Sequence, residues 1–339
     1  MITKSDLNTI DKSGMYQIYD SWPEIAEDAY NTNLDSEYFK DIDHIVFSGM
    51  GGSGTIGDVF SSILSKKDLH ISVIKGYLLP KTVDSNTLVI STSVSGNTQE
   101  TISVLNSTKN LDCKVIAFSS GGIMEDYCLK NNIIFKKIER NHSPRASFTS
   151  FLYSMLKILE NNIPIEKYEI NESILELKKN RNNIFSENLT SINNALNLAK
   201  NITGIPIIYY PWGLQAAAIR FKNSLQENAK IHAITEDVIE ACHNGIVSWE
   251  TKSNVIPILV KGDDDYIKTK ERWAILEKYF NNNEIEYHQI KSIKGNILSK
   301  LINLIYLLDY TSIYKSILTK IDPTPVKSID FIKKELKEK

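Results

Sequence analysis

Gly49-Met50-Gly51-Gly52-Ser53-Gly54 follows a short apolar run at 44–47 and precedes a stretch with helical character at 55–65. Glycines at such a point let the backbone turn tightly from a strand into a helix. Further strand-like and helical stretches alternate as far as residue 160, which predicts a mostly parallel sheet flanked by helices. Strands are expected at 71–74, 87–92, 114–118 and 133–138, and helices at 14–32, 98–108 and 148–160.

The second half of the chain repeats this order of elements. A polar, asparagine-rich segment at 161–201 has helical patterning and predicts a helical connector. Strands are then expected at 206–210, 230–233, 254–260 and 286–290, and helices at 214–225, 236–242, 266–280 and from 295 onward. Asp322-Pro323-Thr324-Pro325 interrupts the last of these, and a final helix can form at 326–336. The predicted division is therefore an N-terminal unit (1–160), a connector (161–201), a C-terminal unit (202–321) and a tail helix (322–339).

Composition limits the kind of protein that this chain can be. Of its 339 residues 42% are hydrophobic and 24% charged, and the formal net charge of −2 argues against a nucleic-acid or membrane-surface partner. The N-terminus carries no targeting signal, and no apolar run reaches the ~18 residues of a membrane span. Three unpaired cysteines and scattered histidines predict a cytoplasmic protein without a metal site.

A second turn, at 93–98, is rich in hydroxyl-bearing residues, whereas the turn at 49–54 contains mostly glycines. Ser93-Val94-Ser95-Gly96-Asn97-Thr98 follows another predicted strand. Ligands of parallel sheets bind where the strands end, and backbone N–H groups at helix N-termini attract anions. We therefore expect the two turns to form a cradle for a phosphate monoester. Its predicted binding residues are Gly52, Ser53, Ser93, Ser95 and Thr98.

A dinucleotide site is the main alternative for the first turn, because its glycines match the GxGxxG spacing. Such a site needs an acidic residue about 20 positions later, at the end of the second strand. The chain instead has Lys67-Asp68-Leu69-His70 before that strand, and it lacks the GK[ST] sequence of a P-loop. The pattern favours a phosphate site without a nucleotide, and no cofactor is expected.

The two turns together resemble the sugar isomerase (SIS) domain, whose serine and threonine loop holds the phosphate of a phosphosugar. Over nearly its whole length the chain is similar to one branch, the bifunctional phosphoglucose/phosphomannose isomerases. This resemblance implies two tandem SIS subdomains with a C-terminal helical tail. It also implies a homodimer with a shared active site that interconverts glucose 6-phosphate, and mannose 6-phosphate, with fructose 6-phosphate through an enediol.

Matching segments of the family assign roles to five residues. Glu227 resembles the base that moves the proton, and Arg145 resembles the arginine placed against the enediolate. His243 matches the ring-opening histidine, since a pKa near neutrality suits that step. Lys333 in the tail resembles a lysine that assists ring opening, and Thr324 is expected to influence the choice between glucose and mannose substrates. Lys327, Lys334 and Lys337 crowd the same helix as Lys333.

The chain departs from the family pattern around the histidine. Family members usually carry an acidic residue after His-Asn, whereas this chain has Gly245 after His243-Asn244. Thr235 stands where a tryptophan is often found. These departures leave open a SIS-fold protein that binds or senses sugar phosphate without turning it over. An aminosugar-phosphate isomerase would add an amidotransferase domain and a pentose-phosphate isomerase usually adds regulatory repeats, so both fit less well.

Overall fold

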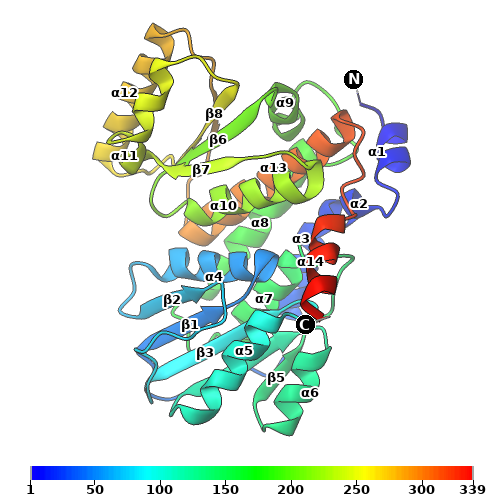
Figure 1. Ribbon diagram of the computed structural model, residues 1–339, viewed down its shortest axis with the longest axis vertical. Coiled ribbons are helices and arrows are strands. Elements are labelled where there is room, and N and C mark those ends of the chain that lie inside the picture. Colours follow the sequence, from blue (N-terminus) through cyan, green and yellow to red (C-terminus); the bar gives the residue numbers. More distant parts are fainter. Residues whose placement is uncertain (1, 338–339) are drawn as a thin grey trace.

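The computed structural model describes residues 2–337 and contains two parallel β-sheets, one in each half of the chain (Figure 1). The first sheet has the strand order β2-β1-β3-β4-β5 and the second has the order β7-β6-β8-β9. The predicted α/β fold class is therefore confirmed. The strands are β1 (His44–Ser48), β2 (His70–Ile74), β3 (Thr87–Ser93), β4 (Lys114–Ser119), β5 (Ile134–Lys137), β6 (Ile205–Tyr210), β7 (Ile234–Asp237), β8 (Val255–Lys261) and β9 (His288–Lys291).

Helices surround the sheets and fill the space between them. The N-terminal half contains α1 (Lys4–Ile10), α2 (Met15–Asp20), α3 (Trp22–Asn31), α4 (Gly51–Leu64), α5 (Gln99–Ser107), η1 (Thr108–Asn110), α6 (Ile123–Lys130) and α7 (Phe148–Ile158). The remainder contains α8 (Lys167–Ile184), α9 (Asn194–Asn201), α10 (Gln215–Ser224), η2 (Leu225–Ala229), α11 (Val238–Ala241), η3 (Gly245–Glu250), α12 (Ile267–Asn282), α13 (Ile297–Leu318) and α14 (Lys327–Lys337).

Helix α13 forms the centre of the molecule. It contacts α8, α9, α10 and α4, and a helix that is apolar on all sides is expected to be buried in this way. Tyrosine side chains of α13 contact the segments packed around it. Tyr306 Oη, for example, donates to the carbonyl of Tyr19 at 2.7 Å, and its ring stacks on Trp22. Within residues 2–337, α13 included, no helix combines the length and the apolar character that crossing a membrane requires. Because α13 also packs on the connector helices, the division at residues 160, 201 and 321 stays a prediction.

Two sequence predictions about secondary structure were wrong. The strand expected at 230–233 is β7 at Ile234–Asp237, because the preceding helix continues into a π-helical turn and Lys230 adopts a left-handed conformation (φ 58°). The single helix expected at 14–32 is divided at Ser21 into α2 and α3, and Pro23 lies in the first turn of α3. The other strands begin and end within two residues of their predicted bounds.

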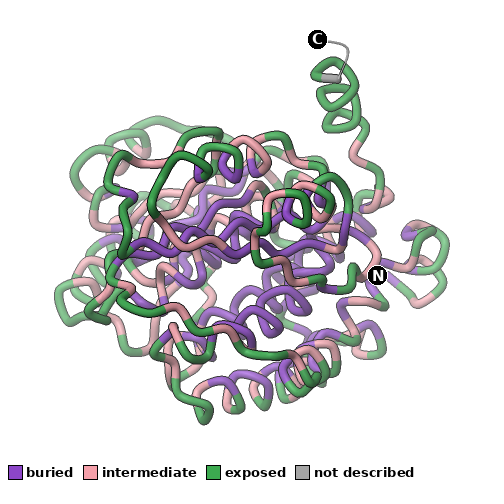
Figure 2. The backbone as a smooth tube through the Cα atoms, turned by 90° about the horizontal axis from the view of Figure 1, so that it is seen from below, coloured by how far each residue is buried: buried purple, intermediate pink, exposed green. Residues whose placement is uncertain are grey.

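The tail helix α14 stands apart from this compact body. Figure 2 shows the buried residues gathered in the centre of the molecule and α14 projecting beyond its surface. The side chains at 327–336 are all exposed, and four of them are large and apolar. They are Ile329, Phe331, Ile332 and Leu336.

Candidate active site

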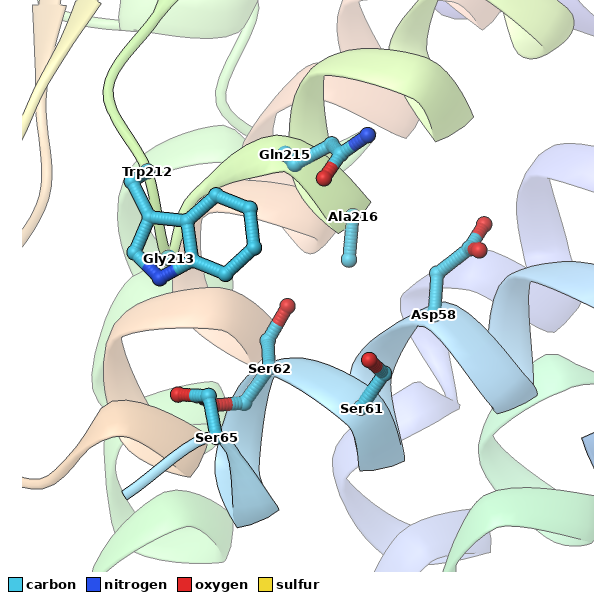
Figure 3. A pocket seen from close by; sticks show the side chains of 8 residues that line it. All are labelled: Asp58, Ser61, Ser62, Ser65, Trp212, Gly213, Gln215 and Ala216. Atoms are coloured by element: carbon cyan, nitrogen blue, oxygen red, sulfur yellow. Dashed lines mark hydrogen bonds between the residues drawn. The ribbon is translucent and has the colours of Figure 1, made fainter. Parts of the chain in front are cut away.

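A small cleft lies between α4 of the first half and the segment that leads into α10 of the second half (Figure 3). None of the residues predicted for the active site lines it. Its wall includes Asp58, which forms an ion pair with Lys75 at 2.5 Å, and the exposed ring of Trp212. The predicted catalytic residues gather elsewhere.

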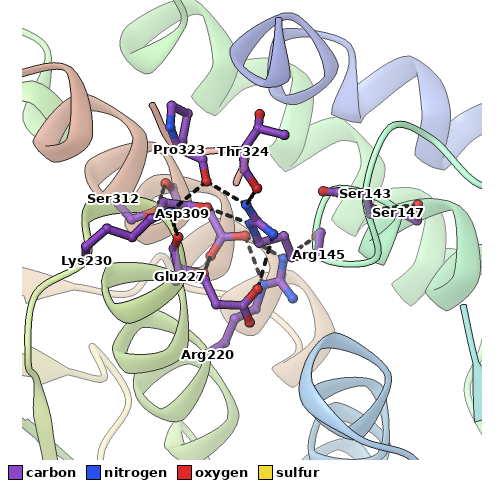
Figure 4. Close-up of polar contacts among 12 residues, drawn as sticks. Ser143, Arg145, Ser147, Arg220, Glu227, Lys230, Asp309, Ser312, Pro323 and Thr324 are labelled. Atoms are coloured by element: carbon purple, nitrogen blue, oxygen red, sulfur yellow. Dashed lines mark hydrogen bonds and ion pairs between the residues drawn. The ribbon is translucent and has the colours of Figure 1, made fainter. Parts of the chain in front are cut away.

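Arg145 connects three parts of the chain (Figure 4). Its guanidinium is buried, and Nη1 lies 3.2 Å from Glu227 Oε2. Nε donates to Asn228 Oδ1 at 2.7 Å. Nη2 donates to the carbonyl oxygens of Pro323 and Thr324 at 2.7 and 3.0 Å. An arginine from the turn before α7 is thereby fixed against the end of α10 and the start of the tail.

A second buried ion pair supports Arg145 from below. Arg220 on α10 donates from Nη2 both to the backbone carbonyl of Arg145 at 2.8 Å and to Asp309 Oδ2 at 2.6 Å. Ser224 donates to the other carboxylate oxygen of Asp309, and the guanidinium of Arg220 lies over the ring of Phe148. Burial raises the pKa of Asp309, while Arg220 opposes that shift. A buried charge with this many partners holds its neighbours in one geometry.

Glu227 lies in the π-helical turn η2, where the sequence predicted the end of an ordinary helix. Such π-helical turns are rare in proteins, and those that occur are often found at functional sites. Lys230 closes the turn and donates to the carbonyl oxygens of Glu227 and, at 3.1 Å, of Pro323. Burial lowers the pKa of Lys230, with a further lowering by Arg145. The Glu227 side chain is 27% exposed, so one side of its carboxylate remains accessible to a ligand.

The first turn of the predicted cradle adjoins the Arg145 turn. A Cβ atom added to Gly52 would lie 3.3 Å from the carbonyl oxygen of Pro144 and 3.5 Å from Arg145 Cα. Ser53 Oγ accepts a hydrogen bond from the backbone N–H of Val94 at 3.3 Å, which joins the first turn to the second. The absence of a side chain at position 52 thus lets the cradle and the arginine share one site.

Hydroxyl groups of the second turn are held by bonds within the turn. Ser93 Oγ lies 2.9 Å from Thr98 Oγ1 and accepts from the backbone N–H of Gly96 at 3.1 Å. Ser95 Oγ accepts from the backbone N–H of Asn97 at 3.3 Å. Gly96 has φ 68°, and a Cβ atom there would overlap the carbonyl oxygen of Gly121. The loop is therefore preformed around its hydroxyls, which is the arrangement a phosphate site needs.

The remaining predicted residues lie differently. Thr324 contributes its carbonyl oxygen to Arg145, and its own Oγ1 is buried without a hydrogen-bond partner. His243 is exposed after α11, and Lys333 is exposed on α14. Among the residues that the structure describes, neither side chain forms a hydrogen bond or ion pair with Arg145 or Glu227. Over the same residues, no three His, Cys, Asp or Glu side chains are grouped as metal ligands.

Comparison with known proteins places this chain in a family. The description "Bacterial phospho-glucose isomerase C-terminal SIS domain" matches residues 191–336. A bifunctional phosphoglucose/phosphomannose isomerase from Caldicellulosiruptor bescii is 31% identical over 96% of this chain and 99% of its own length. The chain belongs to the bifunctional phosphoglucose/phosphomannose isomerase family. The resemblance predicted from the two turns is thereby confirmed.

One further protein is similar to this chain in sequence, and another is similar in structure. A D-glucosamine-6-phosphate 4-epimerase from Sulfolobus acidocaldarius is 29% identical over 84% of this chain and 86% of its own length. The C-terminal domain of glucosamine-fructose-6-phosphate aminotransferase from Francisella tularensis has a TM-score of 0.64 and 16% identity, and the match covers 90% of this chain and 96% of that one. The second likeness shows a shared fold.

Proposed function

We propose that the chain is an aldose-ketose isomerase that interconverts glucose 6-phosphate and mannose 6-phosphate with fructose 6-phosphate. Membership of the family supports the reaction. The observation that carries the assignment of residues is the contact between Arg145 and Glu227 at 3.2 Å, beside the turn that contains Gly52. A base, a fixed cation and a phosphate cradle then share one small region.

In this proposal the two turns hold the 6-phosphate and place C1 and C2 of the open sugar near Glu227. The Glu227 carboxylate carries the proton between the two carbons, and the enediolate oxygen develops its charge near Arg145. Arg145 is suited to this role because Nε and Nη2 are committed to fixed acceptors, so the guanidinium does not have to reorganise during the reaction. Thr324 lies in the segment that Arg145 holds through carbonyl oxygens, and its Oγ1 is buried, so any influence of Thr324 on the choice of substrate acts through the position of that segment.

The test is a pair of glutamate variants assayed with fructose 6-phosphate and coupled detection of glucose 6-phosphate. Glu227→Gln keeps the size of the side chain but removes its basicity, so kcat should fall about 10²–10⁴-fold while KM stays similar. Solvent deuterium incorporation at C2 should fall with it. Glu271→Gln, on the exposed face of α12, is the matched control and should leave both unchanged. A Glu227→Gln enzyme that retained most of its kcat and its deuterium exchange would contradict the assignment.

We also propose that the protein is a cytoplasmic homodimer whose histidine acts in the neighbouring subunit. Figure 1 shows α11, which precedes His243, beside α12 at the outer end of the second sheet and away from the start of α14. The contacts of α11 are with β7, α12 and η3. An exposed residue in that position is available to a second copy, and so is the apolar face of α14. Three free cysteines fit the reducing cytoplasm.

Complementation tests the shared site. Glu227→Gln and His243→Ala subunits are co-expressed with different tags, and mixed dimers are isolated. If the histidine acts on the partner's substrate, each mixed dimer has one intact and one doubly altered site, so isolated mixed dimers should have about half, and the unseparated random mixture about a quarter, of wild-type activity. Recovery of none, with mixed dimers demonstrated, would show that both residues serve the same chain. A monomer in gel filtration would contradict the proposal directly.

A further inference from the structure

Gly245 occupies the position after His243-Asn244 that the family resemblance predicts to be acidic. Its backbone does not require glycine, because its φ lies outside the positive range of left-handed conformations. The space beside it is occupied, however. A Cβ atom added to Gly245 would lie 2.6 Å from Oε2 and 2.8 Å from Cδ of Glu236. The carboxylate of Glu236 therefore stands where the side chain of residue 245 would begin.

Glu236 reaches this place from the second sheet. It belongs to β7 and is the register partner of Tyr209 on β6. Trp249 Nε1 donates to Tyr209 Oη at 2.9 Å, so η3 starts against Glu236 and ends on the neighbouring strand. Burial raises the pKa of Glu236, and Glu240 adds to that effect. Burying a carboxylate beside a second carboxylate costs free energy.

The turn that carries His243 is fixed by three further polar contacts. Asn244 Oδ1 accepts from the backbone N–H of Gly245 at 2.5 Å, and Asn244 Nδ2 donates to Glu240 Oε1 at 2.6 Å. The backbone N–H of His243 donates to the carbonyl of Glu240 at 2.9 Å. The histidine thus lies on a short turn. Gly245 follows two residues later, and the Glu236 carboxylate lies beside it.

We propose that Glu236 is a positioning residue for His243, and that its carboxylate replaces in space the acidic side chain that position 245 lacks. Compared with the family pattern, the negative charge is carried by strand β7 instead of by the turn, and the missing side chain at Gly245 leaves room for it. Glu236 acts on the histidine through the turn, because its carboxylate lies beside Gly245, two residues after His243. This inference rests on the proposed function, because it assigns His243 a step in that reaction.

A charge-relocation cycle tests the proposal. Glu236→Ala removes the carboxylate, and Gly245→Glu places a second one in the same space. Each single variant should lose about 10-fold in kcat with little change in KM, which is the size of coupling expected between residues in contact. The double variant Glu236→Ala/Gly245→Glu has one carboxylate again and should recover most of the loss. Glu236→Gln, which keeps the shape without the charge, should behave like Glu236→Ala.

Two controls separate positioning from stability. Glu240→Ala combined with Gly245→Glu should show no recovery, because Glu236 still fills the space. In a His243→Ala background, Glu236→Ala should cause no further loss of kcat, although any effect on thermal unfolding would persist. Additive losses in the double variant, with an active wild-type enzyme, would overturn the role of Glu236. A folded wild-type protein without isomerase activity would count against the proposed function instead.

Discussion

The four-stranded second sheet repeats the order of β2-β1-β3-β4 in the five-stranded first sheet, and the two sheets differ in the loops at their carboxyl ends. β1 and β3 occupy the same places in the first sheet as β6 and β8 in the second. The loop after β1 is rich in glycine and the loop after β3 in hydroxyls, at 49–54 and 93–98. The loop after β8 reads Gly262-Asp263-Asp264-Asp265, which is acidic.

In the proposed function, phosphate binding is a local property of the two turns rather than of the fold. Three carboxylates in the second sheet's loop would repel a phosphate, whereas free N–H groups and hydroxyls in the first would bind it. The second half contributes Glu227 instead, from the helix that follows β6. Duplicated architecture thus leaves each half free to supply a different part of one site.

The largest expected effect concerns the joint between the halves. Arg220 on α10 forms a buried ion pair with Asp309 and lies over aromatic rings of the first half. Arg220→Met should lower the free energy of unfolding by about 3–5 kcal/mol, because it leaves a buried carboxylate unpaired. Urea unfolding measures this. Lys268→Met, which breaks an exposed pair with Glu271, is the control and should cost about 0–1 kcal/mol. A similar small loss for both would show that this buried arginine contributes little to stability.

The next effect compares equivalent glycines. Gly96→Ala introduces a Cβ atom at φ 68° that overlaps the backbone carbonyl of Gly121. It should cost about 2–5 kcal/mol of stability, from the left-handed conformation and the overlap together, and should raise KM. Gly262→Ala in the second sheet displaces only the Asp265 carboxylate, which accepts from the Gly262 N–H and from Trp273 Nε1, and it should cost less than Gly96→Ala because Gly262 is not left-handed and no backbone atom is overlapped. Equal losses, measured by thermal unfolding and kinetics, would remove the distinction between the two loops.

A smaller effect concerns the hydroxyls of the cradle. Ser95→Ala and Thr98→Ala should each raise KM for sugar phosphates about 10–100-fold, since a hydrogen bond to a charged group contributes about 1.5–3 kcal/mol. Inhibition by inorganic phosphate should weaken in parallel. Asp263→Ala, at the matching loop of the second sheet, should leave KM unchanged. Unchanged KM in the serine and threonine variants, with intact folding, would place the phosphate elsewhere.

The smallest effect is a pH dependence that arises in part in the first sheet. Burial lowers the pKa of His44, with His70 beside it adding to the shift. The unfolded chain therefore takes up a proton near pH 6.5 before the folded protein does, so stability should fall as the pH drops below that value. Urea midpoints at pH 7.5 and 5.5 measure the loss, and His44→Gln should reduce it. An identical pH dependence in that variant would exclude His44 as its source.

How far the sequence alone predicts this protein depends on the distance over which each feature is formed. The glycine turn at 49–54, the hydroxyl turn at 93–98 and the alternation of strands and helices are local, because neighbouring residues set their conformation. These features predicted the fold class and the family, and both are confirmed. Their positions relative to one another follow from the parallel sheet, since strand ends share one edge.

Contacts between distant residues were decided only by the tertiary structure. Arg145 and Glu227 are 82 positions apart, and no local pattern brings them to 3.2 Å. The π-helical turn at Leu225–Ala229 is hidden because its residues suit an ordinary helix, and its effect is to shift β7 by four residues relative to the prediction. From the sequence, Gly245 indicates that an acidic side chain is missing, whereas the structure places the Glu236 carboxylate beside it. A side chain's chemistry can be read from the sequence, but the space that it fills depends on the packing of segments that meet only in the folded chain.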